Sequence, residues 1–346
     1  MGLHLNAWKW IDFCTIFISV WIILSTWAGY AGILSPVWAI VSLVIAFFIN
    51  QKIKLSQHQP PVRISLCVIA VIALGMGILF FGVQGGYDLS ADATPSVATQ
   101  LIGLHIPLTY LPYFDIPFLY QLGLPVLASQ LASLGVSPHT ALWFFAISGI
   151  GFFLLGLIRF GKMINPNPAF LFWIPIVFLG TRLPLHNVFL GEYPWMLSMG
   201  LGMMAVLLFE RSWKLGALVL TASGIAHPYI GGLFAIIWIC FHHPPIKDLL
   251  KVGIASIALS APIFFFQTIP FLGMPKAPFV GADLFSFESI LAYMFLVGAV
   301  PCILTGAWVV HKKMTRQAFT PRELLLLFFV VGGLILSVFL STFFPN

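Results

Sequence analysis

The stretch TRLPLHNVFLGEYP, residues 181–194, holds a cation, an imidazole and a carboxylate within eleven residues of a chain that is only 8% charged. The three are Arg182, His186 and Glu192. Ionisable groups are costly to bury near a bilayer, so their presence in an apolar sequence indicates a functional site. A guanidinium fork suits a phosphate or diphosphate, and a histidine or glutamate can move a proton. The alternative is that Arg182 extends to the lipid headgroups and pairs with Glu192, beside an interfacial belt of Tyr193 and Trp195.

A pair of carboxylates is the second candidate. Asp88 and Asp92 stand four residues apart after the sequence GGY, so on a helix they would share one face. At the mouth of a membrane cavity, a carboxylate can act as a general base or hold a divalent cation. The alternative is that both are solvated turn or cap residues, because YDLSAD has serine and aspartate where helices begin.

Three more polar residues join the candidate set. His227 lies in AHPYIGG, at an expected helix break where side chains can face a cavity, or else it is satisfied by a neighbouring helix. His105 and Lys276 lie in segments that the charge pattern below assigns to the same side of the membrane. His242 and His243 have no partner at metal-ligand spacing and are expected to be plain loop residues.

The composition predicts the elements that carry these residues. Hydrophobic residues make up 60% of the 346-residue chain, and its apolar runs approach or exceed the roughly 20 residues that cross a bilayer. We expect one all-α, polytopic membrane domain over residues 1–346, with about ten or eleven hydrophobic segments surrounded by membrane lipids. The net charge of +6 does not indicate nucleic-acid binding, because the basic residues lie in short gaps between apolar runs, where they orient helices.

The positive-inside rule assigns sides to the loops. Five basic gaps, around residues 52–63, 159–162, 211–214, 247–251 and 312–322, should be cytoplasmic together with the N-terminus of a multi-pass protein of the cell membrane. The outer face then receives 84–113, 182–193, the turn at His227 and 268–287. All eight candidate site residues fall on this outer side, with six of the ten acidic residues of the chain.

Two segments do not fit simple up-and-down crossing. Residues 114–135, rich in proline and glycine, are expected to be re-entrant or interfacial. Residues 213–241 are expected to break at GIAHPYIGG, where Pro228 removes a backbone donor, and to form two short arms beside an outward-facing hollow. In the rival interpretation, 252–267 is re-entrant and 213–241 is one kinked helix.

These features resemble a known family. The acidic YDLSAD, the proline-rich PLTYLPYFDIPFLYQLGLPVLASQLASLG, and then PLHNVFLGEYPWMLSMGLGMM and LVLTASGIAHPYIGGLFAI resemble the membrane part of GT-C-fold glycosyltransferases over roughly residues 64–241. These proteins use a polyprenyl-phosphate-linked sugar at the outer face of the membrane. The resemblance implies that Asp88 or Asp92 is the base or a metal ligand. It also makes Arg182, His186 and His227 candidates for binding the lipid phosphate or the acceptor.

The sequence also departs from the family. No DxD motif is present, and ATPSV follows Asp92 where many relatives have a histidine. We also expect no soluble outer domain of the kind that many relatives carry after the membrane part. We therefore expect a glycosyltransferase that moves a sugar from a polyprenyl phosphate to a lipid, glycan or protein. The alternative is a non-enzymatic membrane protein with the same fold, either a lipid-glycan transporter or an accessory subunit of a larger membrane complex. A transporter should show matching broken helices in two halves, and the sequence predicts one break, at His227–Pro228.

The predicted sidedness can be measured by single-cysteine labelling in a cysteine-free background. Residues 51–63, 159–167 and 311–323 should label from the cytoplasmic side, and 84–113 and 268–287 from outside. Labelling of position 90 from the cytoplasmic side alone would exclude both the topology and an outer-face site.

Overall fold

A computed structural model describes residues 2–53, 98–103, 105–108, 121–164 and 193–270, and single residues or short pieces between 306 and 318. The secondary-structure elements within these ranges are all helices, and the ranges contain no strand. The all-α prediction is therefore confirmed. The chain divides into two compact units, one of Met1–Phe172 with Asn187–Met274 and the other of Trp173–His186 with Pro275–Asn346. All the helices described below belong to the first unit.

The described residues of the first unit form a series of helices. They are α1 (Gly2–Tyr30), α2 (Val37–Gln51), α5 (Gly123–Ala132), α6 (Pro138–Ile164), α9 (Tyr193–Leu208), α10 (Trp213–Ala226), α11 (Pro228–His242), α12 (Ile246–Leu259), the short α13 (Ala261–Ile263) and the π-helical turn η1 (Phe264–Thr268).

Two described helices are long and apolar enough to cross a membrane. The qualifying stretches are Trp8–Tyr30 in α1 and Pro138–Met163 in α6, of 23 and 26 residues. At 1.5 Å per residue they rise about 35 and 39 Å, more than the roughly 30 Å of a hydrocarbon core. Ile246–Thr268 adds a third if its bent pair of helices is one span. These helices associate the chain with a membrane.

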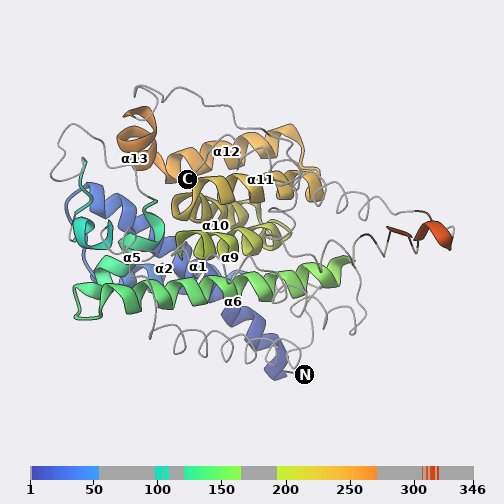
Figure 1. Cartoon of the computed structure of the whole chain (residues 1–346), viewed down its shortest axis with the longest axis horizontal. Helices are drawn as coiled ribbons and strands as arrows, with labels where there is room; N and C mark the ends of the chain where they lie inside the picture. The colour runs from blue at the N-terminus through green and yellow to red at the C-terminus, as the bar shows by residue number, and fades with distance from the viewer. Residues whose placement is uncertain are drawn as a thin grey trace, which may run out of the picture. The chain divides into compact units, whose positions relative to one another are not determined.

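The core is built on close approach between α6 and α9. Figure 1 shows α6, α9, α10 and α12 running side by side through the first unit. A Cβ on Gly149 of α6 would lie 2.5 Å from Leu197 Cα, and a Cβ on Gly200 of α9 would strike the Gly149 carbonyl. Small residues at such a crossing let two membrane helices touch backbone to backbone. Gly202 of α9 allows a similar approach to α11, since a Cβ on Gly202 would collide with the Phe234 ring.

The predicted break at His227–Pro228 is present. His227 is extended (φ −159°, ψ 109°) between α10 and α11, and Pro228 occupies the first turn of α11, where a missing N–H costs nothing. The arms, 14 and 15 residues long, fold back on each other. Phe209, just before α10, stacks on Trp238 near the end of α11, with ring centroids 4.0 Å apart.

A second break lies within 252–267, the segment that the rival interpretation makes re-entrant. Ile246–Leu259 and Ala261–Thr268 meet at 71°, at Ser260 and just before Pro262. Both irregular features therefore occur in the structure, although the sequence presented them as alternatives. The reason is that each depends on its own proline, and nothing in one break relieves the other.

Within 114–135, the described part forms α5, a helix of 10 residues. Its rise of about 15 Å is half a hydrocarbon core, so α5 does not cross a bilayer by itself. Residues Gly123–Gln130 are all buried. Gln130 Nε2 donates to Ser25 Oγ at 2.8 Å, and Gln130 Oε1 accepts from Trp21 Nε1 at 3.0 Å. The helix is therefore enclosed against α1, as a buried short segment must be to satisfy its polar groups.

Two glycines of α6 provide a matched test of the α6–α9 contact. Gly149→Ala should destabilise the protein by about 1–3 kcal/mol, because the new methyl group meets backbone that must move. Gly151→Ala, two residues along, should be neutral or stabilising by up to about 1 kcal/mol, since a Cβ there has no atom within 4 Å. Thermal unfolding of both variants in one detergent makes the comparison, and equal melting temperatures would refute the contact.

Candidate functional site

Of the eight residues that the sequence proposed for a site, two are described by the structure, His105 and His227. The other six lie outside the described residues; they are Asp88, Asp92, Arg182, His186, Glu192 and Lys276. His105 is exposed, on a segment held to the end of α1 by Ile106, whose N–H donates to the Gly29 carbonyl at 3.0 Å. His105 and His227, the two candidate site residues within the described ranges, are not joined by a hydrogen bond or a ring contact.

His227 is buried at the break between α10 and α11, with 8% of its surface exposed. Its carbonyl accepts from the Gly231 N–H at 2.9 Å and from Ser198 Oγ at 3.4 Å. Its Nδ1 has no hydrogen-bond partner among the described residues, and its ring lies 5.9 Å from that of Tyr229. The neighbouring helices thus hold the backbone of His227 and leave one ring nitrogen available to another group.

A pair of buried serines holds α9 against α10 beside this break. Ser198 Oγ donates to the Ser223 carbonyl at 2.8 Å and Ser223 Oγ donates to the Ser198 carbonyl at 2.8 Å, with the two hydroxyl oxygens 2.9 Å apart. Ser198 is little more than one turn beyond Tyr193, the residue that follows Glu192 in the sequence. The start of α9 and the His227 break therefore lie at the same end of the helix bundle.

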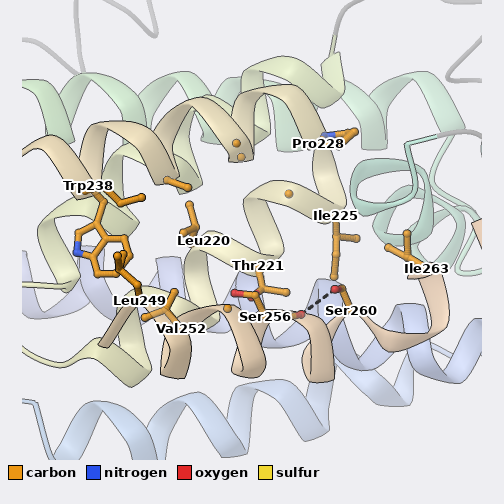
Figure 2. Close-up of a pocket in the computed structure, with 16 residues that line it drawn as sticks. Leu220, Thr221, Ile225, Pro228, Trp238, Leu249, Val252, Ser256, Ser260 and Ile263 are labelled. Carbon is orange, nitrogen blue, oxygen red and sulfur yellow. Dashed lines mark hydrogen bonds between the residues drawn. The ribbon is translucent and has the colours of Figure 1, made fainter. Parts of the chain in front are cut away.

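A groove of about 590 Å³ runs between α10, α11 and α12 (Figure 2). Trp238 and Leu249 lie toward one end, Thr221 and Ser256 in the middle, and Pro228 and Ile263 at the end near the break. From Leu249 to Ser260 it follows α12 for about 17 Å. Its volume is within the roughly 300–1,000 Å³ of ligand pockets. The lining includes Pro228 but not His227.

The groove offers no unsatisfied hydroxyl to a ligand. Thr221 Oγ1 donates to the Ala217 carbonyl at 2.7 Å and lies 3.0 Å from Ser256 Oγ, and Ser260 Oγ donates to the Ser256 carbonyl at 2.7 Å. The remaining lining is aliphatic, aromatic, proline or glycine. A surface of this kind binds apolar groups, because a polar group placed there would lose its hydrogen bonds to water.

Glycines create the space in the groove. Gly224, Gly232 and Gly253, one each from α10, α11 and α12, line it, and a Cβ on any of them would meet no atom within 4 Å. Side chains at these positions would fill the groove, so the sequence keeps it open by omitting them.

A separate ion cluster lies inside the bundle. Asp12 Oδ1 accepts from Arg159 Nη1 at 3.2 Å, and Asp12 Oδ2 accepts from Arg211 Nη1 at 2.6 Å. The side chains of Asp12 and Arg159 are completely buried, and that of Arg211 is 6% exposed. Asp12 was not among the predicted site residues. Its signal in the sequence is a carboxylate inside the first apolar run, which calls for a buried partner.

The expectation that Arg159 begins a basic loop is wrong. Helix α6 continues to Ile164, so Arg159 and Lys162 lie on the helix, and Arg159 turns inward to Asp12. The physical reason is the carboxylate on α1, which gives the guanidinium an ionic partner that a count of loop charges does not include. The ion pairs nevertheless hold Arg159 and Arg211 together beside Asp12, near the start of α1. This agrees with the charge pattern, which assigns both arginines and the N-terminus to the same side of the membrane.

The two polar regions lie at opposite ends of the bundle. Trp143, one turn into α6, contacts the Tyr193 ring at 5.7 Å and so marks the end where α9 begins. Arg159, near the other end of α6, is 16 residues further on, about 24 Å along the helix. The His227 break and the Asp12 cluster are therefore separated by most of the thickness of a bilayer.

No three His, Cys, Asp or Glu side chains within the described ranges lie close enough to share a metal ion. The divalent cation considered for Asp88 and Asp92 concerns residues outside those ranges and stays a prediction.

No protein-family model, no curated protein and no solved structure matches this chain.

Replacing the shared carboxylate tests the ion cluster. Asp12→Asn should destabilise the protein by about 3–5 kcal/mol, because two buried guanidinium groups lose their counter-charge. Asp248→Asn is the matched control, since Asp248 pairs with Lys251 at 2.9 Å on the surface, where the loss should stay below about 1 kcal/mol. Thermal unfolding of both variants is the measurement, and similar small shifts would mean that the buried pairs contribute little.

Proposed function

We propose that this chain is a multi-pass protein of the cell membrane, with a cytoplasmic N-terminus, that binds a polyprenyl-phosphate-linked sugar and transfers the sugar at the outer face. The observation that carries the proposal is the apolar groove between α10, α11 and α12, which ends at the broken helix carrying His227. The sequence resemblance supplies the class of donor and the transfer chemistry.

The groove suits one long hydrocarbon chain. It is elongated, its hydroxyls are already paired, and exposed apolar side chains stand beside it, such as Ile236 on α11 and Ile257 on α12. These residues would face lipid, so a chain can pass from the bilayer into the groove without crossing water. An isoprenoid chain carries regular methyl branches, and the open positions at Gly224, Gly232 and Gly253 provide room for such branches.

The proposed chemistry needs one base and one cation. An acceptor hydroxyl attacks the anomeric carbon, its proton passes to Asp88 or Asp92, and the bond from that carbon to the phosphate oxygen breaks with its electrons on the phosphate. Arg182 stabilises the charge that develops on the departing phosphate. His186, Glu192, His105 and Lys276 are the remaining candidates for contacts with donor or acceptor. His227, whose buried Nδ1 has no hydrogen-bond partner among the described residues, directly precedes the groove residue Pro228.

A lipid-glycan transporter is the second candidate, and one observation favours it. The breaks at His227–Pro228 and at Ser260–Ala261 both reach the same end of the groove, where Pro228, Ser260 and Ile263 line it. Paired broken helices around a binding site are typical of secondary transporters. An accessory subunit of a membrane complex would use the groove in the same way, without moving the lipid.

Filling the groove tests lipid binding. Gly253→Leu and Gly232→Leu should each reduce the polyprenyl phosphate that co-purifies with the protein, by about tenfold if one contact worth 1.4 kcal/mol is lost. Gly151→Leu is the control, because a Cβ there also meets open space but Gly151 lies on α6, outside the groove. Mass spectrometry of extracted lipids gives the ratio. Equal lipid content in all variants would refute the groove as the binding site.

A transfer assay separates the two functions. Proteoliposomes with a labelled polyprenyl-phosphate sugar should yield transferred sugar with the native chain, and Asp88→Asn or Asp92→Asn should abolish transfer while lipid co-purification persists. Movement of the labelled lipid across the bilayer without transfer would identify the transporter. Lipid binding with neither activity would identify the accessory subunit.

A further inference from the structure

The Asp12 cluster leaves half of each guanidinium group unused. Arg159 and Arg211 both contact Asp12 through Nη1. Their Nε and Nη2 atoms are buried and have no hydrogen-bond partner among the described residues. Buried guanidinium donors without acceptors are costly, so an acceptor is expected there.

The unused atoms form the edge of arginine that recognises oxyanions. Nε and Nη2 carry two parallel N–H bonds, which match two oxygens of a phosphate or carboxylate. Asp12 accepts single bonds at Nη1 from both arginines and so holds their positions without occupying this edge. The cluster therefore offers two bidentate donor edges in one small buried region.

The two arginines of the cluster outnumber its one aspartate, which leaves one positive charge that Glu210 can offset. Glu210, next to Arg211 in the chain, is close enough to act on Arg159 electrostatically, but it makes no hydrogen bond to the Nε or Nη2 atoms of either arginine. Glu210 therefore reduces the net charge without supplying the missing acceptors.

Arg211 is the member of the cluster that reaches the protein surface. Its side chain keeps 6% exposure, whereas Asp12 and Arg159 have none. It also lies in the turn between α9 and α10, at the end of the bundle that the charge pattern assigns to the cytoplasm.

We propose that the Nε–Nη2 edges of Arg159 and Arg211, positioned by Asp12, bind a phosphate group at the cytoplasmic end of the bundle. This site is distinct from the His227 break, which lies at the other end of the bundle, about 24 Å away along α6. The phosphate belongs either to an inner-leaflet phospholipid headgroup or to inorganic phosphate in the cytosol, and the two sources share the chemistry that the arginines recognise.

Thermal unfolding of the purified full chain tests the proposal. In detergent, the melting temperature is followed against sodium phosphate at constant ionic strength set with sodium chloride. In nanodiscs, phosphatidylcholine alone is compared with phosphatidylcholine containing phosphatidic acid. Bound phosphate should raise the melting temperature in a saturable way, whereas general salting effects rise without saturation.

Variants assign the effect to the two edges. Arg211→Lys keeps the charge but removes the fork, so the apparent affinity should fall about tenfold, the equivalent of one charged hydrogen bond. Arg159→Lys should do the same, and it replaces Arg211→Lys if that variant does not fold. Lys214→Gln removes an exposed positive charge three residues from Arg211 and should leave the response unchanged.

The outcomes are distinct. A response to phosphatidic acid alone identifies a lipid headgroup, and a response to inorganic phosphate identifies a soluble ligand. No saturable response of the native chain to either, or an equal response in the lysine variants, overturns the proposal. Loss of sugar transfer or of groove-bound lipid leaves this result unaffected, because neither measurement involves the Asp12 cluster.

Discussion

One carboxylate, that of Asp12, is shared by two arginines that are 147 and 199 residues away in the sequence. Inside an apolar bundle, no water competes for these charges, so separating them is costly and the three chain segments that carry them are held together. The start of α1, the end of α6 and the turn before α10 thereby have a fixed relation at one end of the bundle. At the opposite end, the paired Ser198 and Ser223 hydroxyls hold α9 to α10. Between these two polar contacts, packing is supplemented by single hydrogen bonds between helices, such as the one between Thr221 of α10 and Ser256 of α12.

Glycine has two opposite uses in that packing. At Gly149 and Gly200 the missing side chain lets two backbones touch, which brings α6 and α9 together with no space between them. At Gly232 and Gly253 the missing side chain meets no other atom, and the space remains as a groove. Gly231 and Gly224 combine the two, because a Cβ on Gly231 would lie 2.5 Å from Gly224 Cα while the Cβ position of Gly224 itself is open. A tightly packed core and a ligand-sized groove therefore coexist along the same helix, α10.

The sequence predicted those features that depend on neighbouring residues. Pro228 has no N–H wherever the chain goes, so the break before it could be placed from AHPYIGG alone. The Asp12 cluster depends on three distant segments meeting, and neither arginine identifies its partner by spacing. The groove could not be predicted as a defined site either. In the sequence, a glycine that lines empty space looks the same as one that contacts a neighbouring helix. Gly149 and Gly151 both lie on α6, but only Gly149 faces α9. The position of α9, which the sequence does not give, therefore decides which of the two has room for a side chain. Most of the proposed catalytic residues fall outside the described residues, so for them the sequence remains the basis of the proposal.

The direction of the groove relates the proposed donor site to the rest of the bundle. In the proposed function the lipid phosphate stays at the outer face, beside the His227 break, because the hydroxyl groups of the groove are already paired and the rest of its lining is mainly apolar. The chain of the lipid must then enter at Pro228 and extend toward Trp238 and Leu249, away from the reacting centre. Trp213, close to Lys214 and Lys251 with both ammonium groups 5.9 Å from its ring, lies at the start of α10, at the far end of this path. Charged groups there would lie near the end of the hydrocarbon chain, far from the phosphate, and would not compete for it. Contacts along the groove would then position the donor for transfer at its phosphate end.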